Sequence, residues 1–214
     1  HDVFMGEQNI IQAGEAANYE FRLLNKDGWA YASPLLFAAL TSLLKHGTML
    51  ITGAPGIGKT TGAEFAGHFF TGTPLDDILA ATIQGHPQQT EEKMIARYHT
   101  GNLIKEGKET VLPRKFLKCP VKLIDEINRM DPDKKSIILR LIDTGKAVYG
   151  DTLLTAENGP LFATANYTDA GTFSMTPPEL DRFDIAVIVT SPQPWDLEKI
   201  YSRSDEKLNG GLAE

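Results

Sequence analysis

The sequence predicts an α/β protein in which helices cover both faces of a five-stranded parallel sheet. Short apolar runs alternate with helical patterns, as expected for buried parallel strands joined by crossover helices. A glycine-rich loop follows the first run, and carboxylates or an amide follow two later ones. The runs that we predict to be strands are 48–52, 77–82, 121–124, 161–165 and 185–189.

Helices and hairpins are expected around these strands. Ser33 is a suitable N-cap with Pro34 at the first helical position, and Gly47 closes the same helix. Two β-hairpins are also expected, because strand-like segments flank turns at 106–109 and 150–151. The predicted helices are 33–44, 61–70 and 133–143, and the predicted hairpin strands are 102–105 with 110–112 and 146–149 with 152–155.

Composition restricts the class of protein. The 214 residues suffice for one domain with a substantial core, and 42% hydrophobic with 23% charged residues is ordinary for a globular protein. No apolar run reaches the ~18 residues of a membrane span, and no secretory signal is visible. The low cysteine content fits a reducing setting, so the expected location is the cytoplasm. Cys119 is the single cysteine, which excludes an intramolecular disulfide. With no His nearby in sequence, it is interpreted as a buried structural thiol rather than a nucleophile.

The loop at 53–60 matches the phosphate-binding pattern of glycine, four residues, then Gly-Lys-Thr. A strand-type run precedes it and a helical pattern follows, which argues against a chance match in a glycine-rich turn. Backbone N–H groups of such a loop cradle phosphates at a helix N-terminus. The sequence therefore predicts a P-loop NTPase whose nucleotide-binding residues are Gly53, Ala54, Pro55, Gly56, Ile57, Gly58, Lys59, Thr60 and Thr61.

Two residues of the loop have expected roles of their own. Lys59 should reach the β- and γ-phosphates, and the Thr60 hydroxyl should ligate Mg²⁺. The loop recognises phosphates and not the base, so GTP stays an alternative. No Asn-Lys-x-Asp guanine motif is present, since the Asn-Lys-Asp at 25–27 lacks the spacing and precedes the loop. ATP with Mg²⁺ is therefore the expected ligand.

Polar residues end two of the predicted strands. Asp125 is expected to hold Mg²⁺, directly or through water, and Glu126 to act as the general base for the attacking water. The alternative is a solvated pair of charges, but the phosphate loop in the same chain favours the catalytic role. Asn166 could orient the water without titrating, or could be an ordinary turn residue after a strand.

Arg182 lies between Leu180 and Phe183, whose side chains could anchor a short helix before the last strand. Its guanidinium could then stabilise charge on the phosphoryl group at the site of a neighbouring subunit. An ordinary ion pair with Asp181 or Asp184 is the alternative, and chemistry alone does not decide between the two.

The charge is unevenly distributed. The net charge of −7 argues mildly against a surface that coats nucleic acid. Residues 85–122 carry eight basic and four acidic groups, so this segment is +4 and the remainder is −11. A solvated insertion accounts for the segment, and a loop that contacts an acidic partner is the alternative.

Taken together and in this order, the motifs resemble the AAA+ ATPases over roughly residues 33–195. The closest similarity is to the MoxR branch and its dynein-related relatives, and the Asp-Glu-Ile-Asn-Arg string is specific to that branch. The phosphate loop alone would be generic. The stretches that carry the resemblance are Gly-Ala-Pro-Gly-Ile-Gly-Lys-Thr at 53–60, Ile-Asp-Glu-Ile-Asn-Arg at 124–129, Ala-Thr-Ala-Asn at 163–166 and Leu-Asp-Arg-Phe-Asp at 180–184.

The resemblance implies roles for single residues and segments. Asn166 matches the sensor-1 position, Arg182 the arginine finger, and Arg129 an interface or coupling residue. The hairpin at about 146–155 matches the pre-sensor hairpin, and the segment at about 85–120 matches an insertion in the second helix. Such insertions generally face a central pore and contact the client or partner.

The resemblance also implies a division of the chain and an assembly. We expect residues 33–201 to form the ATPase core, 1–32 an N-terminal segment of uncertain role and 202–214 a polar tail. The family carries a helical lid after the last strand, which is expected here to be truncated or missing. A homo-oligomeric ring, a hexamer when full length, is expected.

Three functions remain open at this point. The first is an ATPase that remodels a protein client, with a von Willebrand A domain protein as a partner class implied by the resemblance. The second is a nucleic-acid translocase, helicase or restriction-type motor, which only the +4 segment supports. The third is a nucleotide-dependent scaffold without turnover, which the presence of both Glu126 and Asn166 disfavours.

Overall fold

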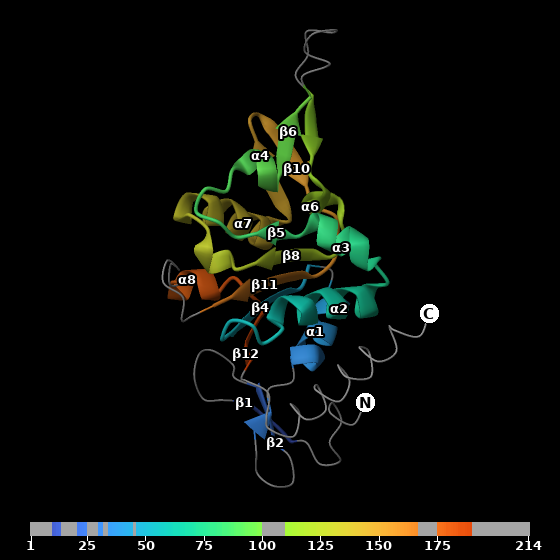
Figure 1. The fold of residues 1–214 in the computed structure, drawn as a ribbon, viewed down its shortest axis with the longest axis vertical. Coiled ribbons are helices and arrows are strands. Elements are labelled where there is room, and N and C mark those ends of the chain that lie inside the picture. The colour runs from blue at the N-terminus through green and yellow to red at the C-terminus, as the bar shows by residue number, and fades with distance from the viewer. Residues whose placement is uncertain are drawn as a thin grey trace, which may run out of the picture.

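The core of the protein is a parallel sheet between two layers of helices (Figure 1). The structure is a computed structural model and describes residues 10–13, 21–24, 30–31, 34–44, 46–99, 110–166 and 175–189. The α/β fold with a five-stranded parallel sheet is confirmed.

The five strands of this sheet have the order β12-β4-β11-β8-β5, and every neighbouring pair is parallel. The register sets Leu161 opposite Thr48 and Ile185 opposite Met49. Because the strands are parallel, their carboxyl ends meet at one edge, where ligands bind in sheets of this kind. The strands are β4 (Thr48–Gly53), β5 (Ile83–Gln84), β8 (Lys122–Asp125), β11 (Leu161–Ala165) and β12 (Ile185–Val189).

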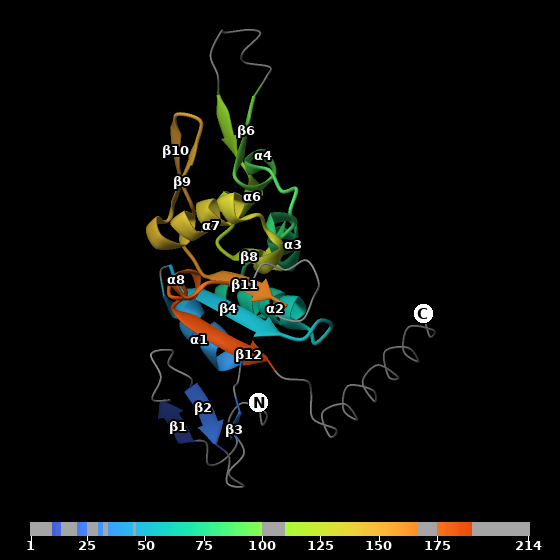
Figure 2. The ribbon, with the colours of Figure 1, turned by 90° about the vertical axis from the view of Figure 1, so that its left-hand side faces the viewer.

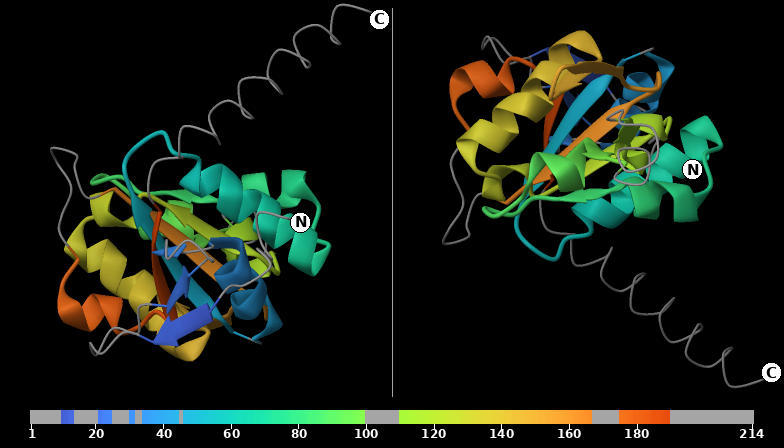
Figure 3. Two further views of the ribbon diagram at one scale, coloured as in Figure 1. Left: turned by 90° about the horizontal axis from the view of Figure 1, so that it is seen from below. Right: turned by 90° about the horizontal axis from the view of Figure 1, so that it is seen from above.

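Helices cover the two faces of the sheet (Figure 3). Side chains on β4 alternate between them: Met49 and Ile51 belong to one buried cluster with Ile78, whereas Leu50 belongs to another with Ile138. This period of two is what a strand buried on both faces requires. The first face is covered by α1 (Pro34–Leu43), α2 (Lys59–Thr71) and α3 (Leu75–Ala81), and the second by α7 (Pro132–Thr144) and α8 (Pro177–Leu180).

One predicted strand is wrong. Residues 77–82 are mostly helix α3, and the strand β5 follows it at Ile83. Pro74 precedes the helix, and acidic Asp76 and Asp77 lie in its first turn, where they complement the helix dipole. Ile78 and Ala81 are buried at helical spacing while Leu79 is half exposed, so the apolar run is one face of a helix.

Two β-hairpins project from the sheet core on the side of α7 (Figure 2). The hairpin of β9 (Lys146–Tyr149) and β10 (Thr152–Thr155) is confirmed with the predicted bounds. The other joins β7 (Val111–Pro113) to β6 (Ala96–Tyr98), so the predicted pairing is wrong: Val111 pairs with Tyr98 and Leu112 with Arg97 instead of with residues of 102–105, which lie outside the described part of the chain. Short helices α4 (Glu91–Met94) and α6 (Lys115–Lys118) flank this second hairpin.

The two hairpins contact each other through aromatic rings. The centroids of Tyr98 and Tyr149 are 5.1 Å apart, with the rings tilted by 46°. Lys134 of α7 also forms an ion pair at 3.2 Å with Glu91 of α4, the short helix that precedes β6. The two hairpins therefore contact each other, and the helix before β6 contacts α7.

The N-terminal part contains a small antiparallel sheet that the sequence does not predict. Its strands are β1 (Ile10–Ala13), β2 (Phe21–Leu24) and β3 (Ala30–Tyr31). No helix among the described residues is long and apolar enough to cross a membrane. The predicted polar tail at 202–214 lies outside the described residues.

Candidate nucleotide site

The phosphate loop connects the carboxyl end of β4 to the first residue of α2, Lys59. Gly56 and Gly58 have φ values of 76° and 80°, a left-handed conformation that side-chain-bearing residues rarely adopt. The loop glycines therefore allow a backbone path that leaves N–H groups at the start of α2, as the motif requires for binding phosphate. The predicted strand, loop and helix arrangement is present.

Lys59 lies inside the loop that precedes it. Its Nζ donates to the carbonyl oxygens of Gly53 at 3.1 Å and Ala54 at 2.5 Å, and the residue is only 9% exposed. Burial lowers the pKa of Lys59, while the negative charges of Asp125 and Glu126 act in the opposite direction. The ammonium group is thus held by weak, neutral acceptors that an anionic phosphate would replace.

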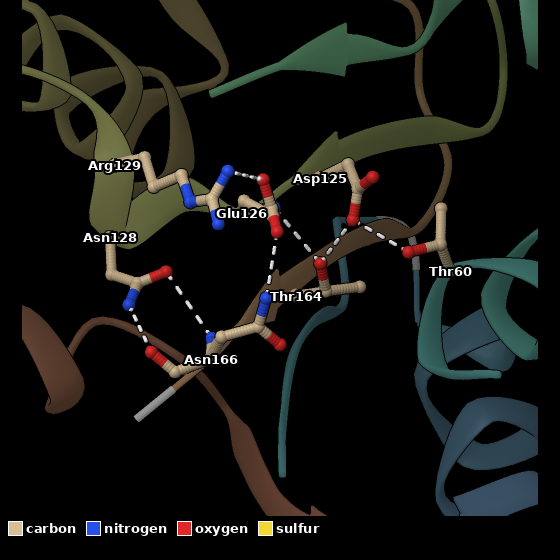
Figure 4. A network of polar contacts seen from close by, with 7 residues as sticks. All are labelled: Thr60, Asp125, Glu126, Asn128, Arg129, Thr164 and Asn166. Atoms are coloured by element: carbon tan, nitrogen blue, oxygen red, sulfur yellow. Dashed lines mark hydrogen bonds and ion pairs between the residues drawn. The ribbon is translucent and has the colours of Figure 1, made fainter. Parts of the chain in front are cut away.

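Thr60 and Asp125 bring the two predicted motifs into direct contact. The Thr60 hydroxyl donates to Asp125 Oδ1 at 2.6 Å, and the Thr164 hydroxyl donates to the same oxygen at 2.6 Å (Figure 4). Thr60 lies in the first turn of α2 and Asp125 ends β8, so the contact joins residues that are 65 positions apart. One oxygen of the Asp125 carboxylate is thus held by hydroxyls from two different elements, α2 and β11.

These two side chains fit a Mg²⁺ site of the kind that relies on nucleotide phosphates. A carboxylate oxygen and a hydroxyl are hard ligands, and Mg²⁺ in nucleotide sites keeps waters and phosphate oxygens as its remaining ligands. Among the described residues there is no cluster of three or more His, Cys, Asp or Glu side chains that could hold a metal without such help.

Glu126 leaves the sheet in a strained backbone conformation. It has a φ of 53°, and it is the only non-glycine residue with positive φ among those the structure describes. Its N–H donates to Thr164 Oγ1 at 2.9 Å, and the preceding carbonyl of Asp125 accepts from the Gly85 N–H at 2.7 Å. A Cβ at Gly85 would overlap the Glu126 carbonyl, so only glycine fits beside this turn. Such strain is concentrated at functional sites.

The Glu126 carboxylate is held at both oxygens. Oε1 accepts from Asn166 Nδ2 at 2.7 Å, and Oε2 forms an ion pair with Arg129 Nη1 at 2.9 Å. Figure 4 shows the two partners on either side of the carboxylate. The predicted base and the predicted sensor therefore touch, although 40 positions separate them in sequence.

Asn166 has an unused acceptor. Its Oδ1 is the only buried side-chain nitrogen or oxygen without a hydrogen-bond partner in the described part of the chain. The residue is 5% exposed, and in Figure 4 the Oδ1 points to the side on which Thr164 and Thr60 lie. A buried acceptor without a partner is costly, so it indicates a position where a water or ligand hydrogen would be bound.

Arg182 lies at the opposite edge of the sheet. It precedes β12, and the neighbouring Asp184 accepts hydrogen bonds from the N–H and hydroxyl of Thr48 at 2.8 and 3.0 Å. Thr48 begins β4, whereas the phosphate loop follows its end, so roughly 17 Å of strand separates them at ~3.3 Å per residue. The Arg182 guanidinium therefore does not belong to the nucleotide site of its own chain.

Three residues of the site are missing from the sequence-based prediction: Thr164, Asn128 and Gly85. Asn128 is buried and bonded to the backbone of Asn166, and Thr164 joins Asp125 to Glu126. Their roles depend on contacts between segments that are far apart in sequence, which no local sequence pattern predicts. Cys119, in contrast, is buried and free as expected, and burial raises the pKa of its thiol.

Comparison with known families agrees with this geometry. Residues 48–183 match the AAA domain of the dynein-related subfamily, which covers more than half of the chain. The chain belongs to this family. The match extends from the first residue of β4 past Arg182, so it includes the phosphate loop, Asp125, Glu126 and Asn166. Membership in the AAA family implies nucleotide binding and a nucleotide-dependent activity.

A solved structure shows the same fold at low sequence identity. This AAA domain is similar to the crystal structure of a candidate ATPase from Cytophaga hutchinsonii, with a TM-score of 0.58 and 20% identity. The similarity covers 80% of this chain and 48% of the other, so the chain spans about half the length of that protein. Among curated proteins, none matches the sequence.

Proposed function

We propose that this AAA domain hydrolyses Mg²⁺-bound ATP and does so as part of an assembly of identical subunits. The observation that carries the proposal is the 2.6 Å contact between Thr60 and Asp125, beside the 2.7 Å contact between Glu126 and Asn166. The phosphate loop therefore lies at the same edge of the sheet as the residues that we propose as metal ligand, base and water-orienting amide. These are the parts that phosphoryl transfer to water needs.

The roles follow from the chemistry of each group. The N–H groups of the loop and Lys59 would bind the phosphates, and Lys59 would exchange its carbonyl partners for the stronger anionic ones. Thr60 and Asp125 would hold Mg²⁺, which when bound neutralises negative charge on the phosphates. No redox or covalent step is needed on the protein side.

Glu126 would accept the proton of the attacking water. Each carboxylate oxygen has one partner, Asn166 or Arg129, and keeps a second lone pair that could receive this proton. Asn166 Oδ1, the acceptor without a partner, would then bind the second hydrogen of that water. Oxygen attack on the γ-phosphorus would break the bond to the bridging oxygen and release ADP and phosphate.

Arg182 would complete the site of the adjacent subunit. Its position at the end of the sheet opposite the loop, with the roughly 17 Å length of β4 between the two ends, and its 39% side-chain exposure support a role in trans. A guanidinium delivered there would offset charge on the transferred group. In a head-to-tail ring, proposed to be a hexamer in the whole protein, every subunit would provide Arg182 to one neighbour and receive the Arg182 of the other.

We further propose that the turnover remodels a protein client, in the manner of MoxR-type ATPases. The proposed motor unit is 33–201 with its insertion at about 85–120, flanked by 1–32 and 202–214. The two hairpins, joined through Tyr98 and Tyr149, are the proposed client-facing elements. A von Willebrand A domain protein is the partner class to test first.

Some basic groups of the insertion are engaged within the chain, which weakens the support for a nucleic-acid motor. Arg114 is bonded to the Glu92 carbonyl, Lys115 is paired with Asp77, and Lys122 is buried within β8. Lys105 and Lys108 lie outside the described residues. A DNA-stimulated and salt-sensitive ATPase activity would nevertheless favour that function over client remodelling.

Steady-state ATPase assays across a range of protein concentrations test the proposal. We expect specific activity to rise with concentration, and Glu126→Gln and Arg182→Ala each to lower it by about 100-fold or more. A mixture of the two variants should regain part of the activity, because the Glu126→Gln chain still carries Arg182 and the Arg182→Ala chain still carries an intact base. Activity that ignores both concentration and Arg182 would contradict the role in trans.

A further inference from the structure

Asn128 makes a two-point contact with the backbone of Asn166. Its Nδ2 donates to the Asn166 carbonyl at 2.6 Å, and its Oδ1 accepts from the Asn166 N–H at 3.3 Å. The Asn128 side chain is one of the few buried polar groups, with 3% exposure. Figure 4 shows both hydrogen bonds between the Asn128 side-chain amide and the Asn166 backbone.

The contact replaces a missing strand neighbour. Up to the pair Ala163–Ile124, β11 is bonded to β8, and the next residues of β8 would continue this ladder. The chain instead leaves the sheet at Glu126, with φ at 53°, and enters the 3-10 turn Ile127–Arg129. The N–H and C=O of Asn166 therefore lose their partner on that side, and the Asn128 amide supplies both hydrogen bonds.

The turn thus acts on both members of the Glu126–Asn166 contact. Arg129 holds one oxygen of Glu126 at 2.9 Å, and Asn128 holds the backbone from which the Asn166 side chain extends. Asn166 Nδ2 donates to Glu126 at 2.7 Å, and Asn166 Oδ1 has no partner. The positions of both atoms depend on the position of the Asn166 backbone. A small rotation of the Asn166 peptide would displace both side-chain atoms.

We propose that Asn128 is a positioning residue for hydrolysis: it fixes the Asn166 backbone so that the Asn166 amide meets Glu126 and the attacking water. This inference rests on the proposed ATPase function. Asn128 does not touch the phosphate loop in any described contact, so its loss should change turnover and not nucleotide affinity. The amide is suited to the role because it offers one donor and one acceptor on the same plane, which neither Asp nor Leu provides.

Three variants separate positioning from simple stabilisation. Asn128→Leu removes both hydrogen bonds at similar size, and Asn128→Asp keeps an acceptor but loses the donor of the 2.6 Å bond. Leu139→Ala in α7 is the matched control, since Leu139 is a buried core residue outside the polar network. For each variant kcat, KM, thermal stability and the affinity for a non-hydrolysable ATP analogue are measured.

We expect kcat of Asn128→Leu to fall by about 10- to 100-fold, as for other residues that orient a catalytic group. KM and analogue affinity should change by less than about threefold. Leu139→Ala should lose stability without this selective loss of kcat. A double-variant cycle sharpens the test: Asn128→Leu should add almost nothing to the loss caused by Asn166→Ala, because it acts through Asn166.

Several outcomes would overturn the proposal. These are an unchanged kcat in Asn128→Leu, an equal loss in the stability-matched control, or losses that multiply in the double variant. Hydrogen exchange of the Asn166 amide provides a readout without turnover: it should be slow in the parent and at least about 10-fold faster in Asn128→Leu. A parent chain without ATPase activity would contradict the proposed function, and equal exchange in both chains would contradict the Asn128 contact.

Discussion

Arg182 Nη1 lies 2.8 Å from Asp143 Oδ2, so the guanidinium proposed to act in trans is paired within its own chain. The partner is neither Asp181 nor Asp184, the two candidates nearest in sequence. Asp184 is instead bonded to Thr48, and Asp143 reaches Arg182 from the last turn of α7. Both side chains are about 40% exposed, so water and salt weaken the pair.

Replacing Asp143 should therefore free the Arg182 side chain with little loss of stability. We expect Asp143→Ala to change the free energy of unfolding by less than about 1 kcal/mol, as for other exposed ion pairs. Specific ATPase activity should increase at low protein concentration, because Arg182 no longer has a competing partner. The increase should vanish in Asp143→Ala/Arg182→Ala. Unchanged activity at every concentration would show that the pair does not restrain Arg182.

Thr164 should be needed for turnover more than for binding. Its hydroxyl accepts from the Glu126 N–H at 2.9 Å and donates to Asp125 at 2.6 Å, and the residue is 1% exposed. Thr164→Val keeps the shape but leaves a buried N–H without a partner, which should cost about 1–3 kcal/mol of stability. Thr164→Ser retains the hydroxyl and should retain activity. Equal kcat in the Val and Ser variants would refute this role.

The buried ion pair between Lys135 and Glu179 should stabilise the chain in a pH-dependent way. Lys135 is 2% exposed, and its Nζ is 3.1 Å from Glu179 Oε1. Glu179 also accepts from the Thr176 N–H at 2.6 Å at the start of α8. Glu179→Gln would leave a buried ammonium without its counter-charge, so we expect a loss of about 3 kcal/mol at neutral pH.

The pH dependence of that loss has a definite direction. Burial raises the pKa of Glu179, but the hydrogen bond from Thr176 and the contacts with Lys135 outweigh it, so the pKa lies below its ordinary value of 4.5. The stabilisation is therefore present above pH 4.5 and is lost as the pH falls through the lowered pKa. Denaturant unfolding should show the gap to Glu179→Gln closing in acid, and Lys135→Met/Glu179→Gln should recover stability at neutral pH.

Because of Lys122, the free energy of unfolding should rise as the pH increases into the mildly alkaline range. Burial lowers its pKa from 10.5 to about 8, although its Nζ donates to the carbonyls of Cys119 and Glu157. Between these two pH values the unfolded chain binds more protons than the folded chain, so the free energy of unfolding rises with pH. Relative to Lys122→Met, the parent should gain up to about 3 kcal/mol over this range. A constant difference in denaturant unfolding would disprove the lowered pKa.

Local patterns were sufficient for most features that depend on residues close in sequence. The phosphate loop, the carboxylates after β8 and the hairpin 146–155 all follow from contiguous residues, and their placement is as predicted. The prediction is wrong at 77–82 because the apolar run by itself resembles a strand, whereas Pro74 and the acidic residues of the first turn are helix signals.

The remaining features of the site depend on which strands become neighbours. Thr164 meets Asp125, and Asn128 meets Asn166, only because β11 lies beside β8 in the sheet. Likewise, Asp143 meets Arg182 because α7 packs against the sheet so that its last turn lies near the start of β12. Each of these contacts joins residues 38 or 39 positions apart, beyond the reach of any helical or strand period.

The placement of the phosphate loop and Arg182 at opposite sheet edges makes the proposed contact between subunits directional. One surface donates and a different surface receives, which is a heterologous interface. An open row of n subunits would then have n − 1 complete sites, because the subunit at one end receives no arginine. Only closure of the row gives every chain a complete site, so activity per chain would report the length and closure of the assembly directly.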